Sequence, residues 1–198
     1  SDAMMMKTRA VADGEGWRPS GSKIWTTNSP YADYCIVFAV TDPEAAAARK
    51  GGISAFLVPT TSPGFEIQRV IRMWGHAGGN EAVLSFDNVR VEPWQVVGRL
   101  HRGFATAMLG VNLGRVYNSA RAVALGRWAV REALEYATIR RTFGKPLSDH
   151  QGIMFPLADA ATQVHAAHLM SLNVCQMLDA GKPARKELSM TKLFAVQA

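Results

Sequence analysis

Residues 140–151 combine side chains that would bind an anionic, planar ligand. The candidates are a guanidinium, a hydroxyl, a ring and an amide: Arg140, Thr142, Phe143 and Gln151. A guanidinium is a planar fork that fits phosphate or carboxylate oxygens through two hydrogen bonds, and an aromatic ring adds a stacking surface. The alternative is a solvated helix end whose arginines complement the helix dipole. The stretch therefore predicts either an anion-binding site or a plain polar turn.

Trp25 and Thr27 form a second candidate pair. They are two residues apart on a strand expected over residues 22–27, so they should point to the same face. An indole is a suitable apolar wall for a flat ligand, and a threonine hydroxyl supplies a compact hydrogen-bond donor. The alternative is a tryptophan of the sheet core beside an incidental threonine.

His165 and His168 are three residues apart on an expected helix. No carboxylate or cysteine beside them completes a set of metal ligands, so a core or interface role is favoured. We predict no metal site.

The overall composition limits the classes of partner. The 198 residues carry a formal net charge of +6, with a sequence pI near 9.6. This charge favours an anionic partner, but the basic residues are scattered rather than clustered, so we expect no nucleic-acid partner. No apolar run reaches the roughly 18–20 residues that span a bilayer, and no secretory signal is present. Cys35 and Cys175 lie far apart in apolar surroundings, which predicts free thiols in a reducing compartment. We expect a cytoplasmic protein, or one of the mitochondrial matrix in a eukaryote.

The first half of the chain has the pattern of an all-β region. Short apolar runs between glycine- and proline-containing turns predict strands over residues 7–11, 17–27, 34–40, 53–58, 65–70, 82–86 and 89–91. The run at 34–40 is continuously apolar, so we expect it to be buried on both faces. The spacing indicates an antiparallel β-sandwich or barrel. No glycine-rich fingerprint follows a strand, which argues against Rossmann and P-loop folds.

The second half changes to a helical period. Apolar residues recur every three or four positions over residues 103–139, which predicts one helix or a kinked pair. Ser148 or Asp149 should cap a second helix that ends near residue 178, with Pro156 kinking it. A third helix should begin near residue 183 and run through Ala198. The expected fold class is α+β, with a β-domain over 1–97 and part of an antiparallel helical bundle over 98–198.

Several short motifs agree in order and spacing with one known family. They are Ser1-Asp2, residues 23–28 (KIWTTN), residues 85–91 (SFDNVRV), Gly114-Arg115, residues 140–145 (RRTFGK) and His150-Gln151. With them the chain resembles the acyl-CoA dehydrogenases over essentially its whole length. The resemblance implies the family's middle β-domain and the first part of its C-terminal helical domain. Because residue 1 is not methionine, we expect the chain to be a fragment of a longer protein.

The resemblance implies an FAD-dependent acyl-CoA dehydrogenase. In this family a carboxylate base removes the α-proton of an acyl-CoA thioester while a hydride passes from the β-carbon to N5 of FAD. An electron-transferring flavoprotein then accepts the electrons, and the enzymes are homodimers or homotetramers. Other chemistry on the same fold stays open: an acyl-CoA oxidase, a nitroalkane oxidase, a flavin monooxygenase, or a non-catalytic homologue that binds acyl-CoA.

The same resemblance implies roles for the cofactor candidates. Trp25 matches a tryptophan that packs on the flavin ring, and Thr27 matches a threonine whose hydroxyl bonds the N5 edge. The positions that match contacts to the FAD of a neighbouring subunit are Arg140, Thr142, Phe143 and Gln151.

The substrate side is implied in the same way. Ser1 matches a serine beside the thioester and the flavin, and Arg115 matches a position near the CoA nucleotide, where the alternative is a salt bridge on a helix face. Residues 73–80 depart from the commoner family loop near the acyl entrance. His76 and Asn80 in this loop are candidates for contacting a polar acyl group.

No catalytic residue is predicted in this chain. In most of the family the base lies in the later part of the C-terminal domain, which would fall beyond Ala198. In one branch it lies early in the first bundle helix, where this chain has Gly114. We therefore expect the 198 residues alone to be inactive.

Overall fold

The computed structural model of the chain describes residues 2–75, 78 and 80–198. Its contacts divide the chain into two units, Ser1–Met108 and Leu109–Ala198. The first unit, hereafter the β unit, holds the main sheet, and the second, the helical unit, holds three helices or parts of helices. Each unit is treated in turn.

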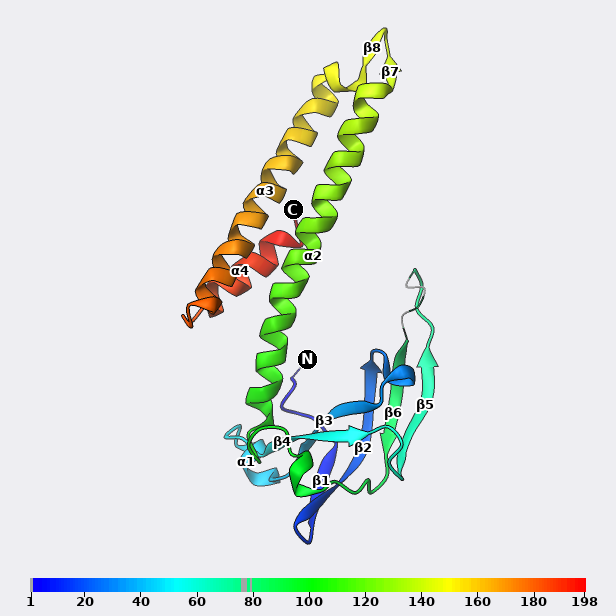
Figure 1. Ribbon diagram of the computed structural model, residues 1–198, viewed down its shortest axis with the longest axis vertical. Coiled ribbons are helices and arrows are strands. Elements are labelled where there is room, and N and C mark those ends of the chain that lie inside the picture. Colours follow the sequence, from blue (N-terminus) through cyan, green and yellow to red (C-terminus); the bar gives the residue numbers. More distant parts are fainter. Residues whose placement is uncertain (1, 76–77, 79) are drawn as a thin grey trace. The chain divides into compact units, whose positions relative to one another are not determined.

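The β unit is built on a six-stranded sheet in the order β4-β3-β1-β2-β6-β5 (Figure 1). The strands are β1 Arg9–Asp13, β2 Gly16–Thr26, β3 Tyr34–Val40, β4 Ile53–Pro59, β5 Phe65–Ile71 and β6 Glu81–Phe86. Every pair is antiparallel except β1 with β3, which is parallel. The sheet is therefore mixed, and the expectation of a wholly antiparallel one is wrong for that pair.

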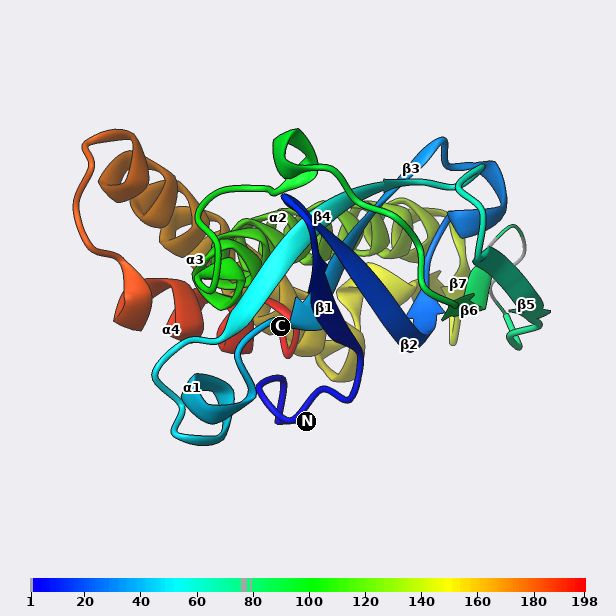
Figure 2. The same cartoon turned by 90° about the horizontal axis from the view of Figure 1, so that it is seen from below.

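Strand β2 belongs to both halves of the sheet. Its first residues, Gly16 to Ser20, pair with β1, and the stretch from Gly21 onward pairs with β6. Figures 1 and 2 show β6 beside β2, with β5 on its far side, away from β1. The two halves share one core, which includes Val37, Phe56 and Leu84. Because β2 pairs with β1 through its first half and with β6 through its second half, the sheet curves around this shared apolar core, as in a sandwich or barrel.

The structure corrects two expectations for the strands. Tyr34 and Ile36 of β3 are exposed whereas Cys35 and Val37 are buried, so the start of this strand is covered on one face only. The strand covered on both faces is β4, in which Ile53 through Phe56 are all buried. Residues 89–91 form no strand; only Val91 makes an isolated bridge, to Trp17.

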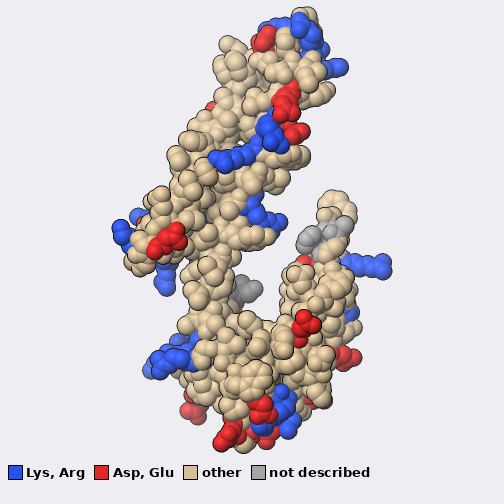
Figure 3. All heavy atoms as spheres, viewed as in Figure 1, with Lys and Arg blue, Asp and Glu red and all other residues tan. Residues whose placement is uncertain are grey.

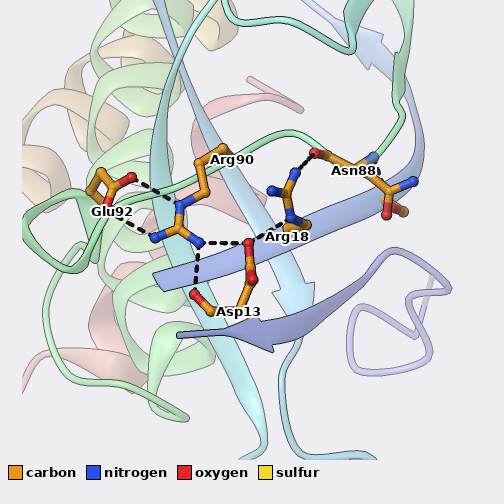
Figure 4. A network of polar contacts seen from close by, with 6 residues as sticks. Asp13, Arg18, Asn88, Arg90 and Glu92 are labelled. Atoms are coloured by element: carbon orange, nitrogen blue, oxygen red, sulfur yellow. Dashed lines mark hydrogen bonds and ion pairs between the residues drawn. The ribbon is translucent and has the colours of Figure 1, made fainter. Parts of the chain in front are cut away.

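Acidic and basic side chains lie side by side on the β unit (Figure 3), and five of its polar residues form one network (Figure 4). Asp13 Oδ2 accepts hydrogen bonds from Arg18 Nε and Arg90 Nη1, both at 2.6 Å. Arg90 also donates to Glu92 Oε1 at 2.9 Å, and Arg18 donates to the Asn88 carbonyl at 3.1 Å. These bonds fasten the segment after β6 to the β1–β2 hairpin.

Helix α2, Gly103–Ile139, starts against β4 and continues into the helical unit. A Cβ at Gly103 would lie 2.6 Å from the Ala55 nitrogen, so glycine is needed for this close approach. The short helix α1, Pro43–Ala47, precedes β4, and Asp42 caps it by accepting from the Ala45 N–H at 3.0 Å. The described residues also form three short 3-10 helices: Ser29–Tyr31, Pro93–Gln95 and Leu147–Asp149.

The helical unit consists of most of α2, α3 Gln151–Asp179 and α4 Arg185–Ala195. A small cluster of buried residues holds the three together: Val123, Val164, Ala167 and Ala195. The bounds of α2 confirm the predicted helix over 103–139. Two details differ. The residue before α3 is His150, with no side-chain cap, rather than Ser148 or Asp149, and α4 ends at Ala195 instead of running through Ala198.

Both cysteines are free: Cys35 is buried in β3 and Cys175 is half-buried in α3. Burial raises the pKa of the Cys35 thiol, which keeps it protonated and unreactive at neutral pH. Among the described residues, no helix has both the length and the apolar character that crossing a membrane requires.

Candidate functional site

The segment between α2 and α3 contains a β-hairpin with a two-residue turn. Strands β7 Arg141–Thr142 and β8 Lys145–Pro146 pair antiparallel and leave Phe143 and Gly144 at the turn. Both turn residues are left-handed, with φ of 50° and 81°. This is the backbone of a tight type I′ turn, in which glycine is at ease and a phenylalanine is strained. The turn projects Phe143 outward, and its side chain is 98% exposed.

His150 supports this hairpin from the start of α3. Its Nε2 lies 3.3 Å from both the hydroxyl and the carbonyl oxygen of Thr142, and its ring meets that of Phe143 edge-on at 6.3 Å. The Lys145 ammonium also reaches the Asp149 carbonyl at 2.9 Å. In the sequence, His150 belongs to the His150-Gln151 motif but has no predicted role. Its position next to Gln151 is the only feature of the sequence that points to the hairpin.

The structure gathers the four predicted residues Arg140, Thr142, Phe143 and Gln151 on this one turn. Arg140 directly follows α2, and its carbonyl accepts from the Leu147 N–H at 2.8 Å, which closes the loop at its base. In the part of the chain that the structure describes, no hydrogen bond or ion pair engages the Arg140 guanidinium. Gln151 is exposed at the first position of α3. Lys and Arg side chains gather at this end of the helical unit (Figure 3). The turn therefore offers free donors and an aromatic surface to a ligand.

Trp25 and Thr27 lie at the far end of β2, but not as regular alternation would place them. The pairing of β2 with β6 shifts register between Lys23 and Thr26, Trp25 is left-handed with φ of 62°, and the strand ends at Thr26. The prediction that Trp25 and Thr27 lie on one regularly alternating strand is therefore wrong. Trp25 is 58% exposed and Thr27 is exposed, so both side chains are accessible from solvent.

Gly114 and Arg115 follow each other on α2. A Cβ placed on Gly114 would meet nothing within 4 Å, so the helix has open space at this position. Arg115 is half-buried, and its Nη1 donates to Asn112 Oδ1 one turn earlier at 3.1 Å. No acid pairs with Arg115 among the described residues.

The remaining candidates carry no site geometry. Ser1 and His76 lie outside the described residues. Asn80 donates from Nδ2 to the Gly78 carbonyl at 2.8 Å. His165 is exposed and His168 half-buried on α3, and the described residues include no group of three or more potential metal ligands.

The fold and the turn together define a class: a β unit followed by a helical unit whose exposed loop carries basic and aromatic side chains. Family comparisons agree with both parts. The acyl-CoA dehydrogenase middle-domain model matches residues 1–89, and the C-terminal-domain model matches residues 101–198. The chain belongs to the acyl-CoA dehydrogenase family.

Individual relatives are similar throughout the chain. An acyl-CoA dehydrogenase of Bacillus subtilis is 37% identical over 198 residues, which is 100% of this chain and 52% of the relative. The structure of butyryl-CoA dehydrogenase from Megasphaera elsdenii matches with a TM-score of 0.91 and 32% identity, covering 98% of this chain and 50% of the other. A structure of PigA with FAD and proline matches with a TM-score of 0.92 and 27% identity, covering 98% of this chain and 50% of the other. The chain thus spans about half the length of the relatives it matches.

Proposed function

We propose that this chain is part of an FAD-dependent acyl-CoA dehydrogenase that oxidises the α,β-bond of an acyl-CoA thioester. The observation that carries the proposal is the Arg140–Gln151 turn of an acyl-CoA dehydrogenase family member: its Phe143 side chain is 98% exposed, and its Arg140 guanidinium has no hydrogen-bond or ion-pair partner among the described residues. The base that removes the α-proton would lie outside these residues, since Gly114 has no ionisable side chain. The chain alone should therefore lack dehydrogenase activity.

The side chains of the turn fit the chemistry of FAD. The Arg140 guanidinium would bind pyrophosphate oxygens in a forked geometry, and Phe143 would stack on a flat ring. Thr142 and Gln151 would add hydrogen bonds, with His150 holding Thr142 in place. FAD, when bound, supplies the hydride acceptor of the reaction.

We propose the following further roles together with FAD binding by the turn. Trp25 and Thr27 would contact the flavin from the β unit, where both are exposed. Arg115 would lie near the CoA nucleotide, and Ser1 near the thioester. We further propose that the turn binds the FAD of a neighbouring subunit in a homodimer or homotetramer, and that an electron-transferring flavoprotein accepts the electrons. A cytoplasmic or mitochondrial-matrix location stays a prediction.

A second candidate is a same-fold flavoenzyme that acts on another substrate. The similarity to PigA, of which a structure with FAD and proline is known, supports this candidate. Both candidates use the Arg140–Gln151 turn, hereafter the FAD turn, to bind FAD. They differ at Arg115, whose proposed ligand is the nucleotide of a CoA ester. An Arg115→Ala variant should raise the KM for acyl-CoA several-fold if the first candidate is right, and should have no effect on an amino-acid substrate.

The test of the FAD turn uses the full-length protein that contains this chain. Arg140→Ala should weaken FAD binding about tenfold or more, because a charge-assisted contact to phosphate contributes roughly 1.5–3 kcal/mol. Arg185→Ala, which removes an exposed arginine at the start of α4, is the matched control. FAD affinity is measured by flavin absorbance after equilibrium dialysis. A colourless protein that ignores added FAD, or equal affinities in the Arg140 and Arg185 variants, would refute the proposal.

A further inference from the structure

Lys23 of β2 carries a nucleophilic group that none of the roles above uses. Its side chain is half-buried, whereas its neighbours Ser22 and Ile24 are exposed. This burial distinguishes Lys23 from every other lysine of the chain, all of which the structure describes. The exposed lysines are Lys7, Lys50, Lys145, Lys182, Lys186 and Lys192.

The register of the sheet places Lys23 on the side of the core. Its direct partner on β6 is Leu84, which pairs on its other side with Ile67 of β5. Side chains of directly paired residues lie on the same face of a sheet. Leu84 is 1% exposed and belongs to the core of the β unit, and Ile67 packs against that core. The Lys23 side chain therefore begins on an apolar surface.

The Lys23 amine has no anionic partner to offset this position. It makes no hydrogen bond and no ion pair within the part of the chain that the structure describes. Because burial disfavours the charged form of an unpaired amine, the pKa of Lys23 lies below the usual lysine value. A larger share of Lys23 than of an exposed lysine is therefore uncharged at neutral pH. An uncharged amine is the nucleophilic form, and apolar surroundings activate lysines in this way.

We propose that Lys23 is a site of covalent acylation and takes its acyl group from a thioester. The uncharged amine attacks the thioester carbonyl, a C–N bond forms and the C–S bond breaks. The leaving thiolate takes up the proton that the amine loses, so the products are an amide and a free thiol. The step needs no oxidant and no further reactant.

The apolar surface beside Lys23 also indicates the class of acyl donor. An amide is uncharged, so acylation removes the cost of holding an ammonium beside Leu84 and Ile67. A short apolar acyl chain would extend over the same surface, whereas a dicarboxylic acyl chain would bring a new charge to it. The donor is therefore an acyl-CoA with a short, uncharged chain. That the protein meets such thioesters rests on the proposed function.

The test incubates the full-length protein that contains this chain with acetyl-CoA at neutral pH. The remaining free lysines are then labelled with deuterated acetic anhydride in denaturant, and mass spectrometry of the peptides gives the acetylated fraction at each lysine. Lys23 should react several-fold faster than any exposed lysine, because more of it is uncharged. This preference should be smaller with succinyl-CoA and absent when the first reaction is run in urea, which removes the burial.

The opposite ranking would overturn the proposal. A lysine whose burial only shields it would react more slowly than the exposed lysines, and equal rates would show that the apolar surface does not activate it. A preference for Lys23 that persists in urea would also overturn the proposal, since it would come from the local sequence and not from the fold.

Two variants complete the experiment. Lys23→Met puts an apolar side chain of similar length on the same surface, so it should keep its resistance to urea and lose the fast-reacting site. Lys186→Met removes an exposed lysine of α4 and should leave the acetylation of Lys23 unchanged. Flavin content, measured on the same samples, reports on the proposed function separately. A colourless protein with a fast-reacting Lys23 refutes the flavin assignment alone, and a yellow protein with a slow one refutes the acylation site alone.

Discussion

The two units of this chain bury their apolar residues to very different degrees. In the β unit one continuous core joins residues of β3, β4 and β6, and Phe56 at its centre is fully buried. The helical unit has only a small core, and most of its large apolar side chains are exposed: Leu113, Leu125, Trp128, Leu134, Phe155, Leu169, Leu172 and Leu193. Exposed apolar surface on this scale is typical of an interface. The β unit thus has a large core of its own, whereas the helical unit exposes apolar side chains that could pack against further protein.

This difference bears on the candidate site. The Arg140–Gln151 turn lies on the helical unit, and its local bonds include those to His150 and to the Asp149 carbonyl. We therefore expect the β unit to be rigid in the isolated chain and the Arg140–Gln151 turn to gain order with its neighbours.

The largest expected effect is the loss of a core side chain in the β unit. Phe56→Ala should lower the free energy of unfolding by about 3–5 kcal/mol, because it opens a cavity in a fully buried site. Leu134→Ala, at a position that is 45% exposed on α2, should lower it by less than about 1 kcal/mol. Hydrogen exchange measured by mass spectrometry resolves the two units. Equal losses of protection in both would contradict the contrast.

An intermediate effect is expected at two glycines of α2, with opposite signs. A Cβ on Gly126 would lie 2.7 Å from Val164 Cγ2, so Gly126→Ala should destabilise the α2–α3 contact by about 1–3 kcal/mol. Gly110→Ala meets nothing within 4 Å and should stabilise the helix by about 1 kcal/mol through helix propensity. Thermal unfolding followed by circular dichroism at 222 nm measures both. A gain in stability for Gly126→Ala would show that the helices are not closely packed there.

The smallest effect is a pH dependence of the polar network on the β unit. Hydrogen bonds from Arg18 and Arg90 lower the pKa of Asp13 below 3.8, and hydrogen bonds from Arg90 lower that of Glu92 below 4.5. Carboxylates with a lowered pKa stabilise the fold above their unfolded values and lose that contribution as the pH falls through the folded ones. Stability should therefore decline below about pH 4.5, and less steeply in Arg90→Met.

Urea titrations of the wild type and the Arg90→Met variant between pH 3 and pH 6 measure this difference. Because the network is partly exposed, the difference should be small and should shrink further in high salt. Parallel pH profiles for the two proteins would show that the network contributes nothing.

Sequence reasoning succeeded where a signal was local and repeated. The helical period that repeats over the 37 residues of α2 predicted its bounds, and the arginine, phenylalanine and glycine that follow it predicted the polar turn before the next helix. These features depend on residues close together in the chain, and helical periodicity is a strong signal over such a length.

It failed where a distant partner decides the local geometry. The bulge at Trp25 arises from the register of β2 against β6, and the parallel pairing of β1 with β3 arises from the route of the chain between them. Such long-range contacts can be identified only when the fold is known.

The backbone of Phe143 sets stability and binding against each other. A left-handed phenylalanine costs on the order of 1–2 kcal/mol that glycine or asparagine would not, and its ring gains nothing from burial in this chain. Replacement by either residue would make the hairpin more stable and remove its stacking surface. Selection for stability alone would therefore favour the loss of the ring, so its presence at this position fits a functional role such as the ligand stacking proposed above.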